Sequence, residues 1–246
     1  MARFVLVHGA FGGAWSWDPV IGPLERAGHT VTAIDLPGAG EDQTPMAGVT
    51  LDAYAARICE ALGEQPGPAI LVGHSMGGVA ITQAAATCAE RIALLVYVAA
   101  FMPRDGQSLL DLTHLPEGAD DQVQANIVID GDPPVATMPD PAARAALMAN
   151  CSAEQIENAI ARSRPQAVAP FVTPVTIPAG ALDGLRRAYV HCTQDRAIPP
   201  ALQLRMIREN PCVDVVEIAT DHSPFFSAAD ELLAALDRFA ALARDV

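Results

Sequence analysis

One serine stands in a pattern that is typical of a nucleophile. Residues 73–77 read Gly-His-Ser-Met-Gly, which matches the G-x-S-x-G motif around Ser75. An apolar run, Ala69–His74, predicts a β-strand directly before the serine, and a helical pattern follows it. In that setting the glycines allow a tight turn that lifts the serine hydroxyl above the sheet edge. A glycine loop that only packs a helix on a strand is the alternative, and the flanking strand and helix favour the nucleophile.

A serine hydroxyl becomes a good nucleophile near neutral pH when a histidine takes its proton and an acid orients the imidazole. His222 follows the predicted strand at residues 213–219, and Asp195 follows the predicted strand at residues 186–194. Loops that follow parallel strands meet at one edge of the sheet, where Ser75 is also expected. We therefore predict that Ser75 is the nucleophile, His222 the base and Asp195 the acid.

The other histidines and acids fit structural roles better. His8 ends the first predicted strand and shapes the following loop, and His74 is held beside the serine. Asp221 is next to His222 in the sequence, and neighbours rarely place a carboxylate against their own ring nitrogen. Asp35 also ends a predicted strand, so it stays as the weaker alternative acid. Three histidines are assigned to the core, the surface or the cap: His191, His29 and His114.

The negative charge that develops on an ester oxygen needs N–H donors, each of which contributes about 3 kcal/mol in comparable sites. The backbone N–H of Met76, directly after the serine, is one expected donor. The other is the N–H of Ala10, since Gly9 permits a tight turn after the first strand, and Phe11 is the neighbouring candidate. Apolar side chains are expected to line the substrate pocket, although each also fits the core: Phe11, Phe101, Met102, Phe171 and Phe225, with Met76 and Phe226 as further candidates.

The positions of these residues depend on an alternation of strands and helices. Short β-rich runs and amphipathic patterns alternate along most of the chain, which predicts an α/β fold with a mostly parallel sheet and helices on both faces. Thr50 is the expected N-cap of the second helix. The strands are expected at residues 3–9, 30–36, 69–74, 92–100, 186–194 and 213–219, and the helices at residues 17–27, 51–62, 199–210 and 228–243, with another directly after Ser75.

The alternation stops between residues 103 and 184. This segment is rich in Pro, Asp and small residues, and its helical stretches begin after Asp140 and after Ser152, the second with a Glu at a capping-box position. We therefore expect an inserted, mostly helical cap at residues 103–184, carried by a single core that consists of residues 1–102 and 185–246.

The composition disfavours several classes of partner. The 246 residues are 51% hydrophobic, and 15 Lys+Arg against 29 Asp+Glu leave a formal net charge of −14, which disfavours nucleic acid and anionic membranes. The five cysteines form no CxxC motif or metal-like cluster, and this odd count without a secretion signal predicts reduced thiols in a cytoplasmic protein. Residues 1–10 are interpreted as a strand and not as a signal peptide. No apolar run is long enough to span a bilayer, and no metal is expected.

Together, these segments resemble the α/β-hydrolase superfamily over nearly the whole chain. The resemblance is strongest in FVLVHGAFGGAWSW, VTAIDLPGAG, LVGHSMGG, VYVAAFMP and HCTQDRAIPP…ATDHSPFF. Within the superfamily the chain is most similar to the branch of plant hydroxynitrile lyases, methyl-salicylate-type methylesterases and bacterial relatives that cleave small esters. The resemblance implies a cap after AAFMP, a serine mechanism without a cofactor, and about six parallel strands, because the chain starts at the third strand of the eight-stranded fold. It leaves the oligomeric state open, and a homodimer is one candidate.

Two positions distinguish the lyases of this branch from the esterases, and the chain resembles the esterases at both. Lyases carry Thr where this chain has Gly9, and Lys where it has Ser223. We therefore expect hydrolysis of a small, largely apolar carboxylic ester through an acyl-enzyme. Lyase or cofactor-free perhydrolase chemistry is the alternative on the same fold, and assays of mandelonitrile cleavage and peracid formation separate it. A ligand-binding protein without catalysis is the alternative from another class, which tight binding without turnover would reveal.

Overall fold

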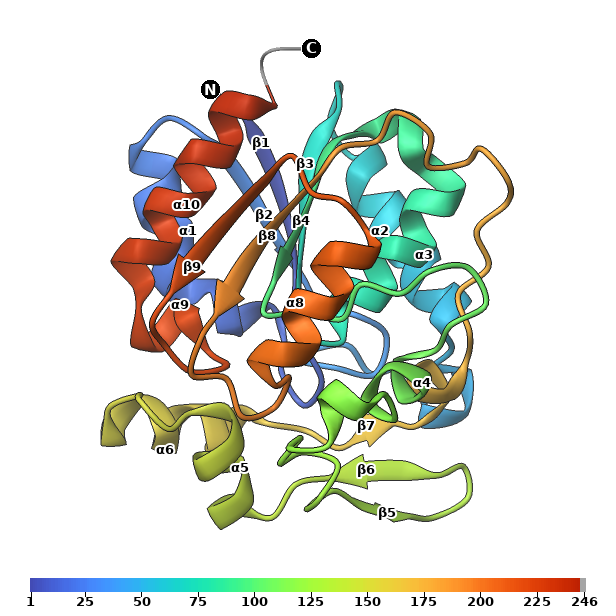
Figure 1. The fold of residues 1–246 in the computed structure, drawn as a ribbon, viewed down its shortest axis with the longest axis vertical. Helices are drawn as coiled ribbons and strands as arrows, with labels where there is room; N and C mark the ends of the chain where they lie inside the picture. The colour runs from blue at the N-terminus through green and yellow to red at the C-terminus, as the bar shows by residue number, and fades with distance from the viewer. Residues whose placement is uncertain (244–246) are drawn as a thin grey trace.

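The computed structural model describes residues 1–243 and shows one parallel sheet between two layers of helices (Figure 1). The last three residues of the predicted core segment 185–246 lie outside the described residues. The sheet has six strands in the order β2-β1-β3-β4-β8-β9, and every neighbouring pair is parallel, which confirms the predicted sheet. Its strands are β1 (Arg3–Val7), β2 (Thr30–Ile34), β3 (Ala69–His74), β4 (Ile92–Val98), β8 (Arg187–Cys192) and β9 (Asp214–Ile218).

The parallel arrangement determines where the loops meet. All six residues of β3 are buried, as expected for a central strand that helices cover on both faces. Since the strands run in one direction, the loops after β3, β8 and β9 leave the sheet at the same edge. These loops carry Ser75, Asp195 and His222, so the fold alone brings the three residues to one end of the sheet.

Helices cover both faces of the sheet (Figure 1). One face packs against α1 (Asp18–Arg26), the short α9 (Pro224–Ser227) and α10 (Ala229–Leu242). The opposite face packs against α2 (Leu51–Gly63), α3 (Gly77–Cys88) and α8 (Pro200–Glu209). Each layer has its own apolar core against the sheet, and this burial is the main source of the stability of such a fold.

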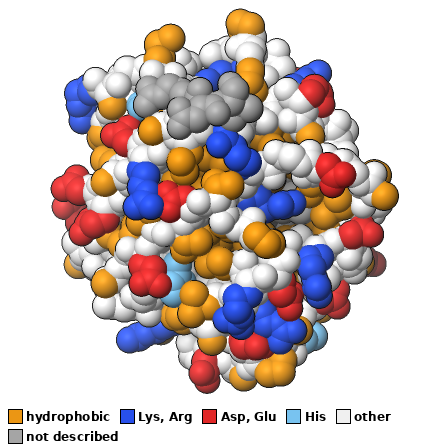
Figure 2. Space-filling view, turned by 45° about the horizontal axis from the view of Figure 1, so that its top comes forward, with side chains coloured by type: hydrophobic (Ala, Val, Ile, Leu, Met, Phe, Trp, Pro, Cys, Tyr) orange, Lys and Arg blue, Asp and Glu red, His pale blue; other side chains and the backbone are white. Residues whose placement is uncertain are grey.

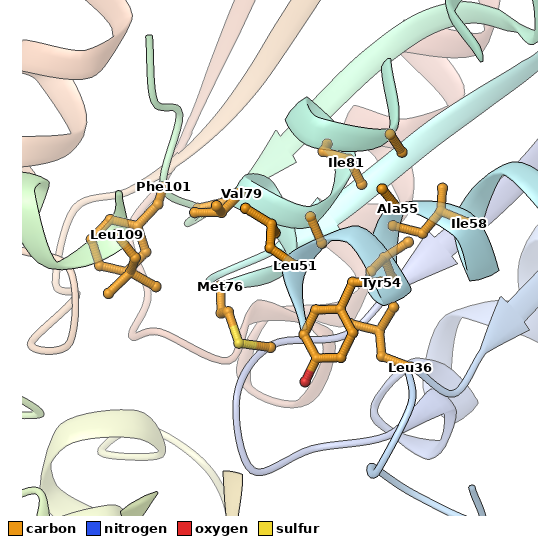
Figure 3. Close-up of a cluster of buried hydrophobic side chains, with 14 of the residues drawn as sticks. Leu36, Leu51, Tyr54, Ala55, Ile58, Met76, Val79, Ile81, Phe101 and Leu109 are labelled. Atoms are coloured by element: carbon orange, nitrogen blue, oxygen red, sulfur yellow. The ribbon is translucent and has the colours of Figure 1, made fainter. Parts of the chain in front are cut away.

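The core below α2 and α3 extends to the edge of the sheet where the serine lies. Tyr54 of α2 packs in one cluster with Val79 of α3, and both side chains are buried (Figure 3). Met76, Phe101 and Leu109 belong to the same cluster. Because the side chain of Met76 is buried to 1% exposure, the backbone directly after Ser75 is held in place by core packing.

Two helix starts show how local sequence fixes element boundaries. Oγ1 of Thr50 accepts a hydrogen bond from the N–H of Ala53 at 3.0 Å, which confirms the predicted N-cap of α2. At α6 (Ala153–Arg162), Oγ of Ser152 accepts from the N–H of Gln155, and Oε1 of Gln155 accepts from the N–H of Ser152. The predicted Glu at the capping-box position is therefore wrong, because the third residue after the cap is Gln155.

Between β4 and β8 the chain leaves the sheet and forms a separate layer at the end of the molecule where the strands finish (Figure 1). Its helices are α4 (Leu109–Thr113), α5 (Asp140–Leu147), α6 and α7 (Ala169–Val172). It also contains a three-stranded antiparallel sheet of β5 (Val128–Asp130), β6 (Val135–Thr137) and β7 (Gln166–Ala167). The sequence did not predict these strands, because two or three residues are too few to show an alternating pattern. The limits of the cap at residues 103 and 184 stay a prediction.

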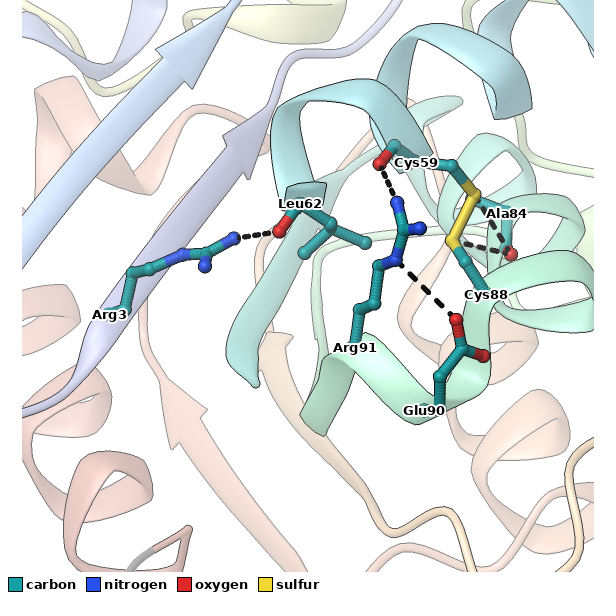
Figure 4. The surroundings of a disulfide bond; sticks show 7 residues. All are labelled: Arg3, Cys59, Leu62, Ala84, Cys88, Glu90 and Arg91. Carbon is teal, nitrogen blue, oxygen red and sulfur yellow. Dashed lines mark hydrogen bonds and ion pairs between the residues drawn. A yellow bond between two sulfur atoms is a disulfide. The ribbon is translucent and has the colours of Figure 1, made fainter. Parts of the chain in front are cut away.

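A disulfide bond joins the two helices on one face of the sheet. Cys59 of α2 and Cys88 at the end of α3 are bonded, with their Cα atoms 6.1 Å apart (Figure 4). Nη1 of Arg91 donates to the carbonyl of Cys59 beside the bond. The prediction of reduced thiols is therefore wrong for this pair, because the contact arises from helix packing that a spacing of 29 residues does not reveal. Three cysteines are free, namely Cys151, Cys192 and Cys212, and the cytoplasmic location stays a prediction.

Removal of this bond is expected to destabilise the fold. Opening a closed loop of 29 residues returns chain entropy to the unfolded state, which for this length is worth about 3.5 kcal/mol. The double variant Cys59→Ser/Cys88→Ser is therefore expected to unfold at lower urea concentration than the oxidised wild type. Dithiothreitol should lower the midpoint of the wild type and leave that of the double variant unchanged. Equal midpoints for the two proteins without reductant would show that the bond contributes nothing.

The surface mixes both charges with apolar groups. On the face shown in Figure 2, acidic and basic side chains lie among apolar ones. Some of them are paired, as for Nε of Arg238 and Oδ2 of Asp214 at 2.6 Å. Exposed pairs of this kind contribute at most about 1 kcal/mol to stability. None of the helices within residues 1–243 combines the length and the apolar character that crossing a membrane requires.

Candidate active site

Ser75 lies in a sharp turn between β3 and α3. Its φ angle is +54°, a left-handed conformation that residues other than glycine rarely adopt. The flanking glycines are required by space, since a Cβ on Gly73 would lie 2.7 Å from the oxygen of Gly77, and one on Gly77 would lie 2.7 Å from the oxygen of His8. The structure therefore places Ser75 in the strained turn that the G-x-S-x-G motif predicts.

His222 and Asp195 meet at the same end of the sheet. Nδ1 of His222 lies 2.8 Å from Oδ2 of Asp195, and both side chains are almost fully buried. Since the carboxylate accepts the hydrogen bond, the proton of the neutral imidazole is on Nδ1 and Nε2 is free to accept another. His222 and Ser75 line one cavity. The structure thus brings together the three residues that the sequence predicts as base, acid and nucleophile.

Four hydrogen-bond donors surround the carboxylate of Asp195. The N–H groups of Ala197 and Ile198 donate to Oδ1 at 2.8 and 3.0 Å. Nε2 of Gln203, a fully buried residue of α8, donates to Oδ2 at 2.9 Å beside His222. The sequence reasoning missed Gln203, because a lone glutamine in a helix carries no motif. The carboxylate orientation is therefore set by the backbone of its own loop and by one core side chain.

His74 supports the backbone of the base. Its Nε2 donates to the carbonyl of His222 at 2.8 Å, and the two rings lie with their centroids 4.6 Å apart. Burial lowers the pKa of His74 well below its ordinary value, and the neighbouring His222 lowers it further. His74 therefore stays a neutral donor. A Cβ on Gly9 would lie 2.8 Å from Nδ1 of His74 and 2.8 Å from Cβ of Ser75, so a larger residue does not fit there without rearrangement.

Asp221 makes no hydrogen bond to the imidazole of its neighbour. Its Oδ2 accepts from the N–H of Asn150 at 2.7 Å, and its Oδ1 accepts from Oγ of Ser227 at 2.6 Å. The N–H of Ser223 also donates to Oδ1, at 3.2 Å. Asp221 therefore ties the loop of His222 to the loop between α5 and α6.

Asp35 and His8 likewise have structural partners. Oδ1 of Asp35 accepts from the N–H of Ala14 at 2.6 Å, which holds the loop after β1 against the loop after β2. Nε2 of His8 accepts from the N–H of Leu36 at 3.1 Å, and its Nδ1 donates to the oxygen of Gly9 at 2.7 Å. Both residues shape the loop that carries Ala10, as the sequence predicts for His8.

Two residues whose backbone N–H groups are free in the described part of the chain line the same cavity as Ser75. Ala10 and Met76 line it, and within residues 1–243 neither of their N–H groups has a protein acceptor. The loop of Ala10 is held in place at the next residue, where Phe11 has a φ angle of +64° and its carbonyl accepts from the N–H of Arg164 at 3.0 Å. A strained backbone that a hydrogen bond from another segment holds in place is a typical way to orient N–H donors toward a ligand. Both N–H groups can therefore donate to a substrate oxygen, as an oxyanion hole requires.

Two small cavities meet at Ser75. One, which we name the Trp15 chamber, has a volume of about 80 Å³, and the other, which we name the Asp121 chamber, has about 30 Å³. Ala10, Phe11 and Ser75 line both chambers, so the serine lies at their junction. The Trp15 chamber is formed mainly by Trp15, Leu147, Met148, His222, Phe225 and Phe226. The Asp121 chamber is formed mainly by Met76, Phe101, Leu109, Asp121, Ile127 and Phe171.

Most of the predicted pocket residues line one of these chambers. Met102 does not, because its side chain is buried in the core and its N–H donates to Sδ of Met206 on α8 at 3.2 Å. Phe101 lines the Asp121 chamber whereas its neighbour Met102 lines neither chamber, so the structure does not support the predicted pocket role of Met102. The residues that line a chamber as predicted are Phe11, Met76, Phe101, Phe171, Phe225 and Phe226.

Apart from Phe171, the sequence did not predict the chamber residues that the cap contributes. Met148 packs near Trp15 and Phe226 in a small apolar cluster, and Leu147 lines the same chamber. Asp121 lines the other chamber. Trp15 lies in the conspicuous stretch AWSW, which offered a signal. The cap residues offered none, since their approach to Ser75 depends on how the cap packs on the core.

Three carboxylates act on the base. Burial lowers the pKa of His222, but the charges of Asp195, Asp221 and Asp121 and the hydrogen bond to Asp195 outweigh burial and raise it above the ordinary value of 6.5. A base must be neutral to take a proton, so activity requires a pH above this raised pKa.

The raised pKa of His222 determines how activity is expected to depend on pH. We expect kcat/KM for a neutral ester to rise with pH along a limb of unit slope, with a midpoint above 6.5, and then to level off. Initial rates at low substrate concentration between pH 5 and about 9 measure this limb. Asp221→Asn removes one of the raising charges and should move the midpoint to lower pH. An acid limb centred below 6.5 in the wild type would show that another group controls the reaction.

Known proteins share this architecture. The chain is 34% identical over 247 residues to methylesterase 7 of Arabidopsis thaliana, covering 95% of this chain and 94% of that protein. It is 35% identical over 240 residues to putative methylesterase 11, chloroplastic, of Arabidopsis thaliana, covering 94% of this chain but only 62% of that longer protein. The solved structure of polyneuridine aldehyde esterase is 27% identical and superposes with a TM-score of 0.87 over 98% of this chain and 99% of the other.

The family assignment rests on the whole core. The match to the Alpha/beta hydrolase family extends over residues 4–235, from the first strand into the last helix. It includes the turn of Ser75, the loop of Asp195 and the loop of His222, together with the parallel sheet that positions them. The chain belongs to the alpha/beta hydrolase family.

Proposed function

We propose that the protein hydrolyses a small, largely apolar carboxylic ester through an acyl-enzyme on Ser75. One observation carries this proposal: Ser75 lies at the junction of two apolar chambers, which His222 and two N–H groups without an acceptor in residues 1–243 also line. An ester has two halves on either side of its carbonyl carbon, and each half fits one chamber. The catalytic roles of Ser75, His222 and Asp195 are part of the proposal.

The first half of the reaction forms the acyl-enzyme. Oγ of Ser75 attacks the carbonyl carbon while Nε2 of His222 takes the hydroxyl proton, and the carbonyl electrons move onto the oxygen. The N–H groups of Ala10 and Met76 stabilise this oxyanion. Asp195 holds the imidazole through Nδ1 and stabilises its positive charge. The intermediate then collapses, the bond to the alcohol oxygen breaks, and His222 returns the proton to the leaving alcohol.

The second half restores the enzyme. His222 removes a proton from a water molecule, whose oxygen attacks the acyl carbon to form a second tetrahedral intermediate. This intermediate expels Oγ of Ser75, which recovers its proton from His222, and the carboxylic acid leaves. Each step uses the same base and the same oxyanion donors, so no further group is needed.

The size and lining of the chambers support a small substrate. Volumes of about 80 and 30 Å³ suit groups of a few heavy atoms, and their walls are mostly apolar. The names of the relatives support esters as the class, since several are methylesterases. A methyl ester with its acyl group in one chamber and its methyl group in the other is the simplest substrate of this kind.

Two residues favour hydrolysis over cyanohydrin cleavage. Gly9 lacks room for the Thr of the resembling lyases, because a Cβ there would approach His74 and Ser75 at 2.8 Å. Ser223 directly follows His222 and lines the Trp15 chamber. The position at which the lyases carry Lys therefore has no positive charge in this chain.

The test combines turnover with labelling. We expect the protein to hydrolyse p-nitrophenyl acetate and methyl esters of small acids, and one equivalent of an organophosphonate to abolish this activity. Mass spectrometry of a digest should then find the phosphonyl group on Ser75. Hydrolysis that persists after full labelling, a label on another residue, or faster cleavage of mandelonitrile than of any ester would contradict the proposal.

A further inference from the structure

The Asp121 chamber contains one acidic group among apolar walls. Asp121 is only 4% exposed and lines this chamber together with Ser75. Much of the remaining wall is apolar, including Phe101, Leu109, Ile127, Phe171 and Ile198. A carboxyl group in such surroundings is costly unless a partner satisfies it. No step of the proposed ester hydrolysis involves Asp121 beyond the effect of its charge on His222, so its place in a chamber beside the reacting serine needs another explanation.

The two carboxylate oxygens of Asp121 differ in their hydrogen bonds. Oδ1 accepts from the N–H groups of Val123 and Gln124 at 2.7 and 2.9 Å, and thereby forms the turn that follows Asp121. Within residues 1–243, no side chain or backbone group hydrogen-bonds to Oδ2. The turn itself needs only one acceptor oxygen, which an asparagine or a serine would also supply. The second oxygen is therefore the atom of Asp121 that is left for a ligand.

The position of Asp121 is fixed relative to the proposed catalytic residues. Its N–H donates to the oxygen of Gly118 at 3.0 Å, and the N–H of the next residue donates to the oxygen of Arg196 at 2.9 Å. Arg196 directly follows Asp195, so the cap loop is attached to the loop of the acid. A group held this firmly can discriminate between substrates that differ by one atom.

Asp121 also changes its charge at a pH just below the range in which His222 is neutral. Burial raises its pKa to about 6, opposed by the two backbone hydrogen bonds and by His222, while the negative charge of Asp195 raises it further. Above this pKa the group is an anion in an apolar chamber, and an anion there attracts a hydrogen-bond donor strongly.

We propose that Asp121 selects the substrate: its Oδ2 accepts a hydrogen bond from a hydroxyl or ammonium group on the half of the ester that enters the Asp121 chamber. This inference rests on the proposed ester hydrolysis and narrows its substrate class. The preferred ester is apolar around the scissile bond and carries one donor at the far end of the half that occupies this chamber.

The test compares esters that differ at one atom. Methyl butanoate, methyl 3-hydroxypropanoate and methyl 3-aminopropanoate differ only in a terminal methyl, hydroxyl or ammonium group on the acyl half. Propyl acetate and 2-hydroxyethyl acetate make the same comparison on the alcohol half. For the wild type we expect kcat/KM to be higher for the donor ester than for its methyl counterpart in at least one of the two series, and that series identifies the half that binds in the Asp121 chamber.

The variants separate selection from structure. Asp121→Asn and Asp121→Ser keep an acceptor for the turn but lose the carboxylate, and each should lower the ratio of donor to methyl ester by about 10- to 100-fold. Asp120→Asn removes the same charge from an exposed neighbour and should leave the ratio unchanged. A purely structural Asp121 would change kcat/KM for both esters of a pair equally, so an unchanged ratio in both variants overturns the inference.

The pH dependence of the ratio gives a second readout. In the wild type the preference for the ammonium ester should rise through a pH of about 6 as Asp121 ionises, and Asp121→Asn should abolish this rise. His222 and Asp195 face Asp121 from the neighbouring loops, so wild type and Asp121→Asn are compared at each pH, and only the part of the rise that this variant removes is assigned to Asp121. If no ester in the set is hydrolysed and Ser75 is not labelled, the proposed function fails. If the esters are hydrolysed but the ratio of donor to methyl ester is the same in the wild type and in the Asp121 variants, only this inference is refuted.

Discussion

Ser75→Ala is expected to lower kcat for ester hydrolysis by about 10⁴- to 10⁶-fold and to abolish labelling by an organophosphonate. The chemistry requires an oxygen that can bond to the carbonyl carbon, and alanine supplies none. The hydrogen-bond donors and chambers remain, so a small residual rate over uncatalysed hydrolysis is expected from oxyanion stabilisation alone. Single-turnover assays with p-nitrophenyl acetate, at enzyme in excess over substrate, measure this residual rate.

The control for this variant is a measurement of its thermal unfolding midpoint, which shows whether the protein is still folded. The main-chain partners of Ser75 do not involve its hydroxyl: its carbonyl accepts from the N–H groups of Gly78 and Phe101 at 3.0 and 3.1 Å. Alanine keeps these bonds, so the thermal unfolding midpoint should stay close to that of the wild type. A folded Ser75→Ala protein with more than a few per cent of wild-type kcat would exclude Ser75 as the nucleophile.

Asp195→Asn is expected to lower kcat by about 10⁴-fold while the protein stays folded. All four partners of this carboxylate are donors, and an amide can accept at only one of its two ends. If its oxygen faces the N–H groups of Ala197 and Ile198, its NH₂ group faces Gln203 and Nδ1 of His222. Two donors then oppose each other unless His222 moves its proton to Nε2. In that tautomer the imidazole cannot take the proton of Ser75.

Asp221→Asn is the matched comparison. Asp221 lies beside His222 in the sequence, but its carboxylate serves Asn150, Ser223 and Ser227. This variant should therefore change kcat by less than about tenfold, since it removes no bond to the imidazole. A loss of similar size in both variants would show that the imidazole depends on the loop as a whole and not on the bond to Asp195. Pre-steady-state release of p-nitrophenol separates acylation from later steps in each variant.

The sequence predicted the parts of the site that local patterns control. Ser75 could be found because a nucleophile turn demands small residues at Gly73 and Gly77, and the demand is visible as a motif. Asp195 and His222 could be found because they follow strands, and parallel strands all end at one edge of the sheet. Strand and helix limits differed by one or two residues, since the ends of elements depend on hydrogen bonds outside the periodic pattern.

The parts that tertiary packing controls could not be predicted. In the sequence Met102 is as good a pocket candidate as Phe101, but in the structure Phe101 lines the Asp121 chamber and Met102 is buried in the core. Cys59 and Cys88 meet because α2 and α3 pack side by side. Asp121 looks like any acidic residue of a polar loop until the cap is folded over the serine. In each case the decisive contact joins segments that are distant in the sequence.

The junction of two chambers at Ser75 also governs the order of product release. The alcohol leaves its chamber while the acyl group is still bonded to the serine, so that chamber becomes the route by which the second nucleophile arrives. Water and a second alcohol then compete for the same acyl-enzyme, and an added alcohol that fits the vacated chamber would be converted to a new ester. At a given concentration of the added alcohol, the ratio of acid to new ester would not depend on the alcohol of the original ester, because every substrate with the same acyl group passes through one common intermediate.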